Sequence, residues 1–377
     1  MSPESAKIEP ERIAERLSAL PGLDRVVEAA GETPVYLVGG AVRDLLLGRE
    51  RTDLDIAVEG DAAALGRRLG GEIRTHARFA TATVHVDDVE LDLATTRSET
   101  YPAPGALPAV RPAPLSEDLA RRDFTVNAMA LSLAGEPELI DPHGGVRDLE
   151  GATLRVLHDR SFADDPTRAL RAARYAARYG FTLEAGTETL LRDADLDTVS
   201  RDRVEAELRK LAREPRSRRG FELLDDWGLI ELDRRSAELI DAVDGVVASE
   251  PWAGVVDRDK AVLAAALGRG LDAARELASA QPASPSGAVE LARGHDGVAL
   301  ALARALGADW IDRYVSEWRK VRLSIDGDDL LAAGIPEGAA LGRGLAAAMR
   351  ARLDGETSGA EDELRIALDA AREDDSE

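Results

Sequence analysis

The feature that most constrains the fold is a change in hydrophobic periodicity at about residue 149. Before it, short segments such as 81–86 (TATVHV) and 89–95 (VELDLAT) alternate apolar and polar residues, which is typical of half-buried strands. After it, Ala, Leu, Arg and Glu dominate, and apolar residues recur every three or four positions. The sequence therefore predicts a mixed α/β unit followed by an all-helical region.

Composition limits the chemistry available to the chain. The 377 residues include no cysteine, which excludes disulfides, thiolate zinc sites and cysteine nucleophiles. The N-terminal segment is polar, and no apolar run approaches the roughly 20 residues that a membrane span needs. We therefore expect a soluble, cytoplasmic protein with no membrane partner.

The formal net charge of −23 is unevenly distributed. Residues 352–377 are rich in acids, whereas a basic run at 209–219 contains a single acid, Glu214. The run is either a solvated helix end or a surface for a nucleic-acid backbone, because such binding depends on local fields and not on net charge. Its basic members are Arg209, Lys210, Arg213, Arg216, Arg218 and Arg219.

Residues 34–58 predict a strand, a glycine turn, a helix and a second strand. Gly39 and Gly40 stand between the first strand and the helix, where they allow an anion to approach the backbone closely. Arg43, on the first helical turn, could hold a phosphate with two hydrogen bonds. The alternative is a plain tight turn, because the segment has neither a Walker loop nor a dinucleotide fingerprint.

Two acids on the second strand, Asp53 and Asp55, point to the same side because strand side chains repeat every two residues. They repel each other unless a cation lies between them, so we expect a magnesium site completed by substrate phosphates. A charged, exposed strand edge is the alternative. Asp92, between two leucines on a nearby predicted strand, is a candidate third carboxylate, and Glu90 competes with it by parity.

A third motif, Arg121-Arg122-Asp123, precedes an apolar segment. Its arginines could clamp phosphate oxygens while the acid orients a guanidinium or a ribose hydroxyl. A surface cluster of salt bridges is the alternative.

The fourth motif is a helix that follows Pro166, with Asp164 or Asp165 as its cap. Its arginines recur at spacings of three, three and four, hence on one face, and no partner acid follows any of them at the fourth position. The pattern indicates a face that binds anions, with a solvated basic face as the alternative. The arginines are Arg168, Arg171, Arg174 and Arg178.

Proline-rich and polar stretches mark the connections. Residues 100–118 predict a long loop, and residues 279–288 a loop or linker.

Four motifs in order resemble those of the class II tRNA nucleotidyltransferases, which comprise the CCA-adding enzymes and bacterial poly(A) polymerases. They are LVGGAVRD with DLD (37–55), RRDFTVNAMA (121–130), DDPTRALRAARYAARYGF (164–181) and a C-terminal segment (324–355). The resemblance implies an α/β nucleotidyltransferase-fold head (1–148) followed by an all-α neck (149–215), an all-α body (216–288) and an all-α tail that binds tRNA (289–377). It also implies addition of C and/or A from CTP and ATP to the tRNA 3′ end, with release of pyrophosphate.

The resemblance assigns roles to individual residues. Asp53 and Asp55 would hold two Mg²⁺ ions, with Asp92 as the third carboxylate that serves attack by the tRNA 3′-hydroxyl on the α-phosphate. The tRNA would lie along Arg201–Arg219. The triphosphate would contact Gly40 and Arg43, and the phosphates and sugar would contact Arg122 and Asp123. The base would contact Asp165 and Arg168. Arg171 and Arg174 would line the same cleft.

One position departs from the family pattern and leaves nucleotide choice open. Asp164 stands where the family usually has glutamate, and a shorter acid could hold Arg168 differently. The alternatives are therefore addition of CCA, of CC only or of A only. A poly(A) polymerase, a small-molecule nucleotidyltransferase and an inactive RNA-binding protein on the same fold are further alternatives. The acidic tail argues against the first of these, the long helical region against the second, and the paired acids against the third.

Overall fold

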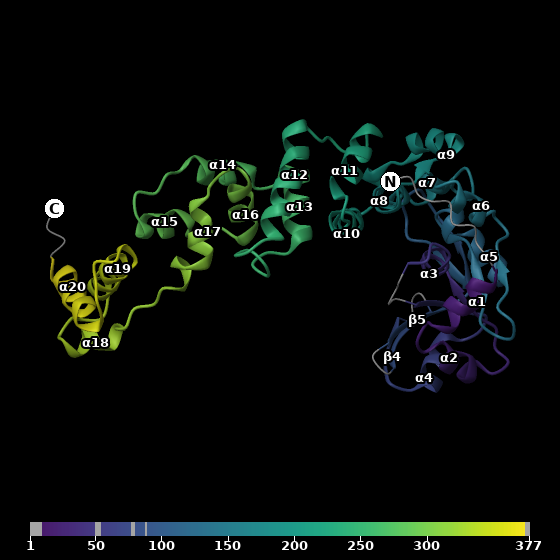
Figure 1. Ribbon diagram of the computed structural model, residues 1–377, viewed down its shortest axis with the longest axis horizontal. Coiled ribbons are helices and arrows are strands. Elements are labelled where there is room, and N and C mark those ends of the chain that lie inside the picture. The colour runs from purple at the N-terminus through teal and green to yellow at the C-terminus, as the bar shows by residue number, and fades with distance from the viewer. Residues whose placement is uncertain (1–9, 50–53, 77–79, 87–88, 374–377) are drawn as a thin grey trace. The chain divides into compact units, whose positions relative to one another are not determined.

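The computed structural model describes residues 10–49, 54–76, 80–86 and 89–373, and the chain forms two compact units, Met1–Leu229 and Ile230–Glu377 (Figure 1). The first unit contains a mixed β-sheet and several helices, and the described part of the second unit is helical. This arrangement confirms the predicted fold class, in which helices follow an α/β region.

A seven-stranded mixed sheet forms the centre of the first unit. Its strand order is β3–β4–β5–β2–β1–β8–β9. Strands β2 and β5 run parallel, and the other neighbouring pairs are antiparallel. The strands are β1 (Val35–Val38), β2 (Leu54–Val58), β3 (Glu72–His76), β4 (Thr81–Val86), β5 (Val89–Thr95), β8 (Ala130–Ser132) and β9 (Leu139–Ile140).

Side-chain alternation gives the sheet two different faces. Apolar residues of β2 and β5, such as Ile56 and Leu93, are buried in the main core. Residues of opposite parity, Asp55 and Asp92 among them, lie on the other face, where α5 (Leu115–Ala120) packs. The main-core side is covered by α1 (Pro10–Ser18), α2 (Leu23–Ala30), α3 (Gly40–Leu46) and α4 (Ala62–Leu69).

The prediction of a long loop at 100–118 is wrong in part. Strand β6 (Arg97–Thr100) pairs with β7 (Ala109–Pro112) in a separate two-stranded ribbon, and α5 follows directly. Pro112 is tolerated because each strand of a two-stranded ribbon has an open edge. A missing N–H at that edge removes no hydrogen bond between the strands.

Helix α8 (Thr167–Tyr179) joins the helical region to the sheet. Its apolar face, including Ala172 and Ala176, belongs to the same core as the strands. The predicted head and neck therefore share one core, and the first compact unit ends at Leu229. The other helices after the sheet are α6 (Gly145–Glu150), α7 (Ser161–Asp164), α9 (Ala185–Leu190), α10 (Arg201–Ala212) and α11 (Ser217–Asp226).

The second unit contains nine α-helices among its described residues, and the last three, with the segment before them, enclose a small core of their own around Leu330 and Ala348. The predicted linker at 279–288 is shorter than expected, because the Ser284 side chain caps a helix with proline in its first turn. In the described ranges no helix is long and apolar enough to cross a membrane. The nine are α12 (Arg234–Val247), α13 (Arg258–Ala266), α14 (Leu271–Ser279), α15 (Pro285–Ala292), α16 (Gly297–Ala305), α17 (Trp310–Ser316), α18 (Gly327–Ala332), α19 (Ala339–Asp354) and α20 (Ala360–Arg372).

Two glycines of α19 provide a matched test of this packing. A Cβ on Gly344 would lie 2.5 Å from the carbonyl oxygen of Ala367 in α20, whereas a Cβ on Gly342 meets nothing within 4 Å. We expect Gly344→Ala to destabilise the second unit by about 1–3 kcal/mol through overpacking. Gly342→Ala should be neutral or stabilise it by up to about 1 kcal/mol. Thermal unfolding of the two variants measures the difference, and equal melting temperatures would contradict the close helix contact.

Candidate active site

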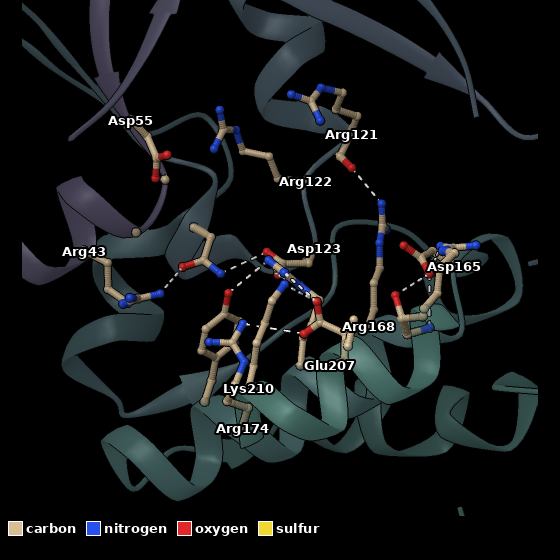
Figure 2. A pocket seen from close by; sticks show the side chains of 18 of the residues that line it. Arg43, Asp55, Arg121, Arg122, Asp123, Asp165, Arg168, Arg174, Glu207 and Lys210 are labelled. Atoms are coloured by element: carbon tan, nitrogen blue, oxygen red, sulfur yellow. Dashed lines mark hydrogen bonds and ion pairs between the residues drawn. The ribbon is translucent and has the colours of Figure 1, made fainter. Parts of the chain in front are cut away.

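A cavity of about 830 Å³ in the first unit brings together residues from the glycine turn, β2, the segment after α5, α8 and α10 (Figure 2). Asp55 and Asp165 lie on opposite sides of this view, and Arg122 and Asp123 lie between them. Asp92 is not part of the cavity lining, and Asp53 lies outside the described residues. The residues singled out from the sequence that line the cavity are Gly39, Gly40, Arg43, Asp55, Arg121, Arg122, Asp123, Asp165, Arg168, Arg171, Arg174, Arg178 and Lys210.

The glycine turn brings the backbone close to an arginine. Gly39 has φ of +67° and precedes α3, and a Cβ built on it would lie 2.6 Å from Arg122 Nη1. Arg122 Nε is buried and has no hydrogen-bond partner among the described residues. The turn therefore needs glycine for both its conformation and the room that Arg122 occupies.

Arg43 is buried and rigidly held. Its Nε donates to Asp44 at 2.9 Å, and its Nη atoms donate to Asn127 and Tyr179. The guanidinium also stacks 4.4 Å from the centre of the Tyr179 ring. Nη2 also lies 2.9 Å from Asp44 Oδ1, so all three guanidinium nitrogens have partners within the protein.

Asp55 and Asp92 lie side by side. They are register partners in the parallel pair β2–β5, so their side chains share one face. Thr83 Oγ1 donates to Asp92 at 2.7 Å, whereas Glu90 pairs with His85 at 3.2 Å and is about half exposed. The alternation of side chains left both Asp92 and Glu90 as candidates for the third carboxylate. The strand register makes Asp92 the direct neighbour of Asp55.

These two carboxylates fit the ligand chemistry of a divalent cation, which takes oxygen donors from one or two acids. Within the described ranges, which omit Asp53, no group of three acidic, histidine or cysteine side chains is placed to hold a metal ion.

A buried acid that sequence analysis missed fixes the two consecutive arginines. Asp118 accepts from Arg121 at 2.7 Å and from Arg122 at 2.8 Å. Burial raises the pKa of the Asp118 carboxyl, but both arginines outweigh that effect and hold the pKa below its ordinary value. The spacing of three and four residues, about one helical turn, was the available signal.

Asp123 is also buried and saturated with donors. It accepts from Arg171 Nε at 2.8 Å, Asn127 Nδ2 at 2.9 Å and the backbone N–H of Phe124 at 2.8 Å. Burial raises the pKa of this carboxyl, but Arg171 and the Asn127 hydrogen bond outweigh burial, so the pKa lies well below its ordinary value. Asp123 therefore positions Arg171 and remains ionised.

Asp165 and Arg168 adjoin one another at the start of α8. Asp165 Oδ1 accepts from Thr167 N at 3.1 Å and from Arg203 at 3.0 Å. The N-cap position of α8 is Pro166, and not Asp164 or Asp165 as the sequence had predicted. Arg168, 4% exposed, donates to Ser161 Oγ and to the carbonyl oxygen of Arg121.

The neighbouring acid, Asp164, does not hold Arg168. It pairs instead with Arg160 at 2.9 Å. Arg203, on α10, is a further cavity residue that sequence analysis did not identify, because its link to Asp165 depends on how α10 packs and not on local spacing.

The arginine face of α8 finds its acidic partners on another segment. Glu207 lies 3.8 Å from both Arg171 and Arg174, and Glu214 lies 3.8 Å from Arg174 and 3.7 Å from Arg178. The four arginines do lie on one face, as their spacing predicted, and all of them line the cavity. Arg168, Arg171 and Arg174 are therefore not a solvated surface, whereas the Arg178 side chain is 41% exposed.

The basic run at 209–219 is less positive than its sequence indicated. Arg209 pairs with Glu205 at 2.9 Å, Lys210 with Glu207 at 2.7 Å and Arg218 with Glu222 at 2.8 Å. These acids lie one helical turn away, and all three fall outside the run. Arg216 is exposed, and in the described part of the chain its guanidinium has no partner.

Known proteins are similar to this chain along most of its length. Residues 35–155 match the family model of the poly(A) polymerase head domain. A CC-adding tRNA nucleotidyltransferase of Deinococcus radiodurans is 38% identical over 91% of this chain and 90% of its own length. An A-adding tRNA nucleotidyltransferase of Geobacter sulfurreducens is 34% identical over 89% of this chain. The chain spans 45%, 25% and 48% of the length of three A-adding relatives.

Solved structures show the same fold along most of the chain. A CCA-adding enzyme in its apo form aligns with a TM-score of 0.79 at 28% identity, covering 95% of this chain and 98% of that one. A Thermotoga maritima CCA-adding enzyme complexed with tRNA aligns with a TM-score of 0.71 at 27% identity, covering 95% and 97%. The chain therefore belongs to the tRNA nucleotidyltransferase family that carries the poly(A) polymerase head domain.

Proposed function

We propose that this protein adds C and/or A to the 3′ end of tRNA, taking CTP or ATP and releasing pyrophosphate without a nucleic-acid template. The observation that carries the proposal is the composition of one cavity. On one side it has a strand carboxylate, Asp55, and on the other it has Asp165 and Arg168, which are suited to contact a base. Arginines lie between them. Relatives named as CC-, A- and CCA-adding enzymes support the reaction class, and a tRNA substrate implies a cytoplasmic site of action.

Asp55 and Asp92, with Asp53 as predicted from the sequence, are the residues that would hold Mg²⁺. When bound, the ion supplies positive charge to the phosphates and lowers the pKa of an attacking hydroxyl. Phosphoryl transfer otherwise asks a protein mainly for positioning and electrostatic stabilisation. The fixed arginines Arg43, Arg122 and Arg171 supply that positioning along the cavity.

Base selection is assigned to Asp165 and Arg168. Oδ1 of Asp165 is engaged by Thr167 and Arg203, and within the described residues no donor reaches Oδ2. A carboxylate oxygen accepts from the exocyclic amine that cytosine and adenine share, and a guanidinium donates to a ring nitrogen.

The tRNA is proposed to contact the basic run at 209–219, where Arg216 is the exposed cation with no acid partner in the described part of the chain. The CC-adding relative matches nearly the whole chain, whereas two A-adding relatives are 46% and 42% identical over about half of it. Because these comparisons favour different specialists, the number of nucleotides added needs a direct test.

The test uses tRNA transcripts that lack A, CA or CCA at the 3′ end, Mg²⁺ and each labelled nucleoside triphosphate in turn. We expect incorporation of C, of A or of both, and the pattern across transcripts distinguishes CCA, CC and A addition. Long tracts of A on unrelated RNA would favour the poly(A) polymerase alternative. Lack of incorporation on every transcript would contradict the proposed function.

Asp55→Ala should lower incorporation at least a hundredfold, because it removes charge stabilisation at the reacting phosphate. Binding of tRNA to the same variant should stay within about twofold of wild type, since the basic run is unchanged. Glu90→Ala is the matched control on the neighbouring strand and should retain activity. A fully active Asp55→Ala enzyme, or an inactive Glu90→Ala enzyme, would contradict the assignment.

Gly39→Ala should raise the KM for nucleotides about tenfold or more, because the new methyl group displaces the Arg122 guanidinium. Gly70→Ala is the control, since Gly70 also has positive φ, +73°, but a Cβ there meets nothing within 4 Å. It carries the backbone strain without the contact at the site. If steady-state kinetics gave both variants the same KM, the role of the glycine turn would be refuted.

A further inference from the structure

Glu207 is an acid in the wall of a cavity that otherwise favours anions. It lies on α10, is 8% exposed, and lines the cavity beside Arg171, Arg174 and Lys210 (Figure 2). A buried carboxylate in this position lowers the positive potential that a triphosphate would meet. The chemistry proposed above gives it no role.

Glu207 is loosely held in comparison with the other buried acids. Its Oε1 accepts one hydrogen bond, from Lys210 Nζ at 2.7 Å, and both arginines remain at 3.8 Å. Its Oε2 is buried without a hydrogen-bond partner, and so is Nε of the adjacent Arg174. Asp123, by contrast, is hydrogen-bonded directly to Arg171.

The unused hydrogen-bonding capacity lies on the cations as well as on the acid. Arg174 has ion pairs at 3.8 Å with two acids but leaves Nε unsatisfied. A phosphate group is a better partner for such a cation, because it offers several oxygens and can accept two parallel hydrogen bonds. Arg171, Arg174 and Lys210 form a group that we name the pocket cations. They are therefore arranged to exchange one anion for another.

We infer that Glu207 is an internal anion that competes with nucleotide phosphates for Arg171, Arg174 and Lys210. The inference rests on the proposed function. It gives Glu207 the role of positioning these cations during the entry of nucleotide and the exit of pyrophosphate. The carboxylate lies among the cations, and when phosphates bind they take over its partners. When pyrophosphate leaves, Glu207 pairs with them again and opposes retention of the product.

The test is Glu207→Gln, which keeps the size of the side chain and a hydrogen-bond acceptor for Lys210 but removes the charge. Titration calorimetry of the full chain with pyrophosphate and with inorganic tripolyphosphate should show the Kd falling about tenfold. Steady-state incorporation should show a lower KM for CTP or ATP and stronger inhibition by pyrophosphate. A Kd that is unchanged or higher would overturn the inference, because loss of a merely structural anchor weakens anion binding.

Two further variants sharpen the result. Glu205→Gln changes an acid on the same helix that pairs with Arg209 and does not line the cavity, so its pyrophosphate Kd should equal that of wild type. Glu207→Asp keeps the charge and should stay within threefold of wild type. Tighter binding in Glu205→Gln to the same extent as in Glu207→Gln would overturn the inference, because it would reduce the effect to overall charge.

The two proposals fail in different ways. If wild type incorporates nucleotides and Glu207→Gln does not tighten pyrophosphate binding, the competing role of Glu207 is wrong and the proposed function stands. If no transcript accepts a nucleotide while Glu207→Gln still tightens pyrophosphate binding, the proposed function is wrong and the competition at the pocket cations stands.

Discussion

The ion pair between Asp123 and Arg171 connects the sheet to the helices that complete the cavity. Arg171 Nη2 lies 2.7 Å from Asp123 Oδ2, although the residues are 48 positions apart. Through Asn127 the same carboxylate is linked to Arg43, and through Arg171 it is linked to Glu207. A continuous polar network thus runs from α3 to α10, and because it is buried, loss of either charge would leave the other uncompensated.

This network explains how so many arginines can share one pocket. Like charges on one helical face repel each other, and α8 tolerates them because Asp123, Glu207 and Glu214 face it from other segments. The apolar face of the same helix is fixed in the sheet core. The protein itself therefore fixes the positions of the cations, which is what the proposed phosphoryl transfer would require.

Much of this organisation could be predicted from short-range patterns. Period-two alternation predicted the strands and placed Asp55 on the polar face, and a spacing of three and four predicted the arginine face of α8. The partners that fix these residues could not be predicted, because Asn127 and Glu207 reach the site through tertiary packing. The strand at Ala109–Pro112 was missed because prolines usually mark loops, whereas the open edge of a two-stranded ribbon accepts them.

The central claim is that protein side chains, and not a template strand, choose the base. The most direct measurement is equilibrium binding of CTP, ATP, UTP and GTP to the protein without RNA, for wild type and for Asp165→Ala. The account predicts that wild type binds CTP and ATP at least about tenfold more tightly than UTP and GTP, because Asp165 needs an amine donor where uracil and guanine carry a carbonyl oxygen. The variant should lose this difference. Equal affinity of wild type for all four nucleotides would contradict it.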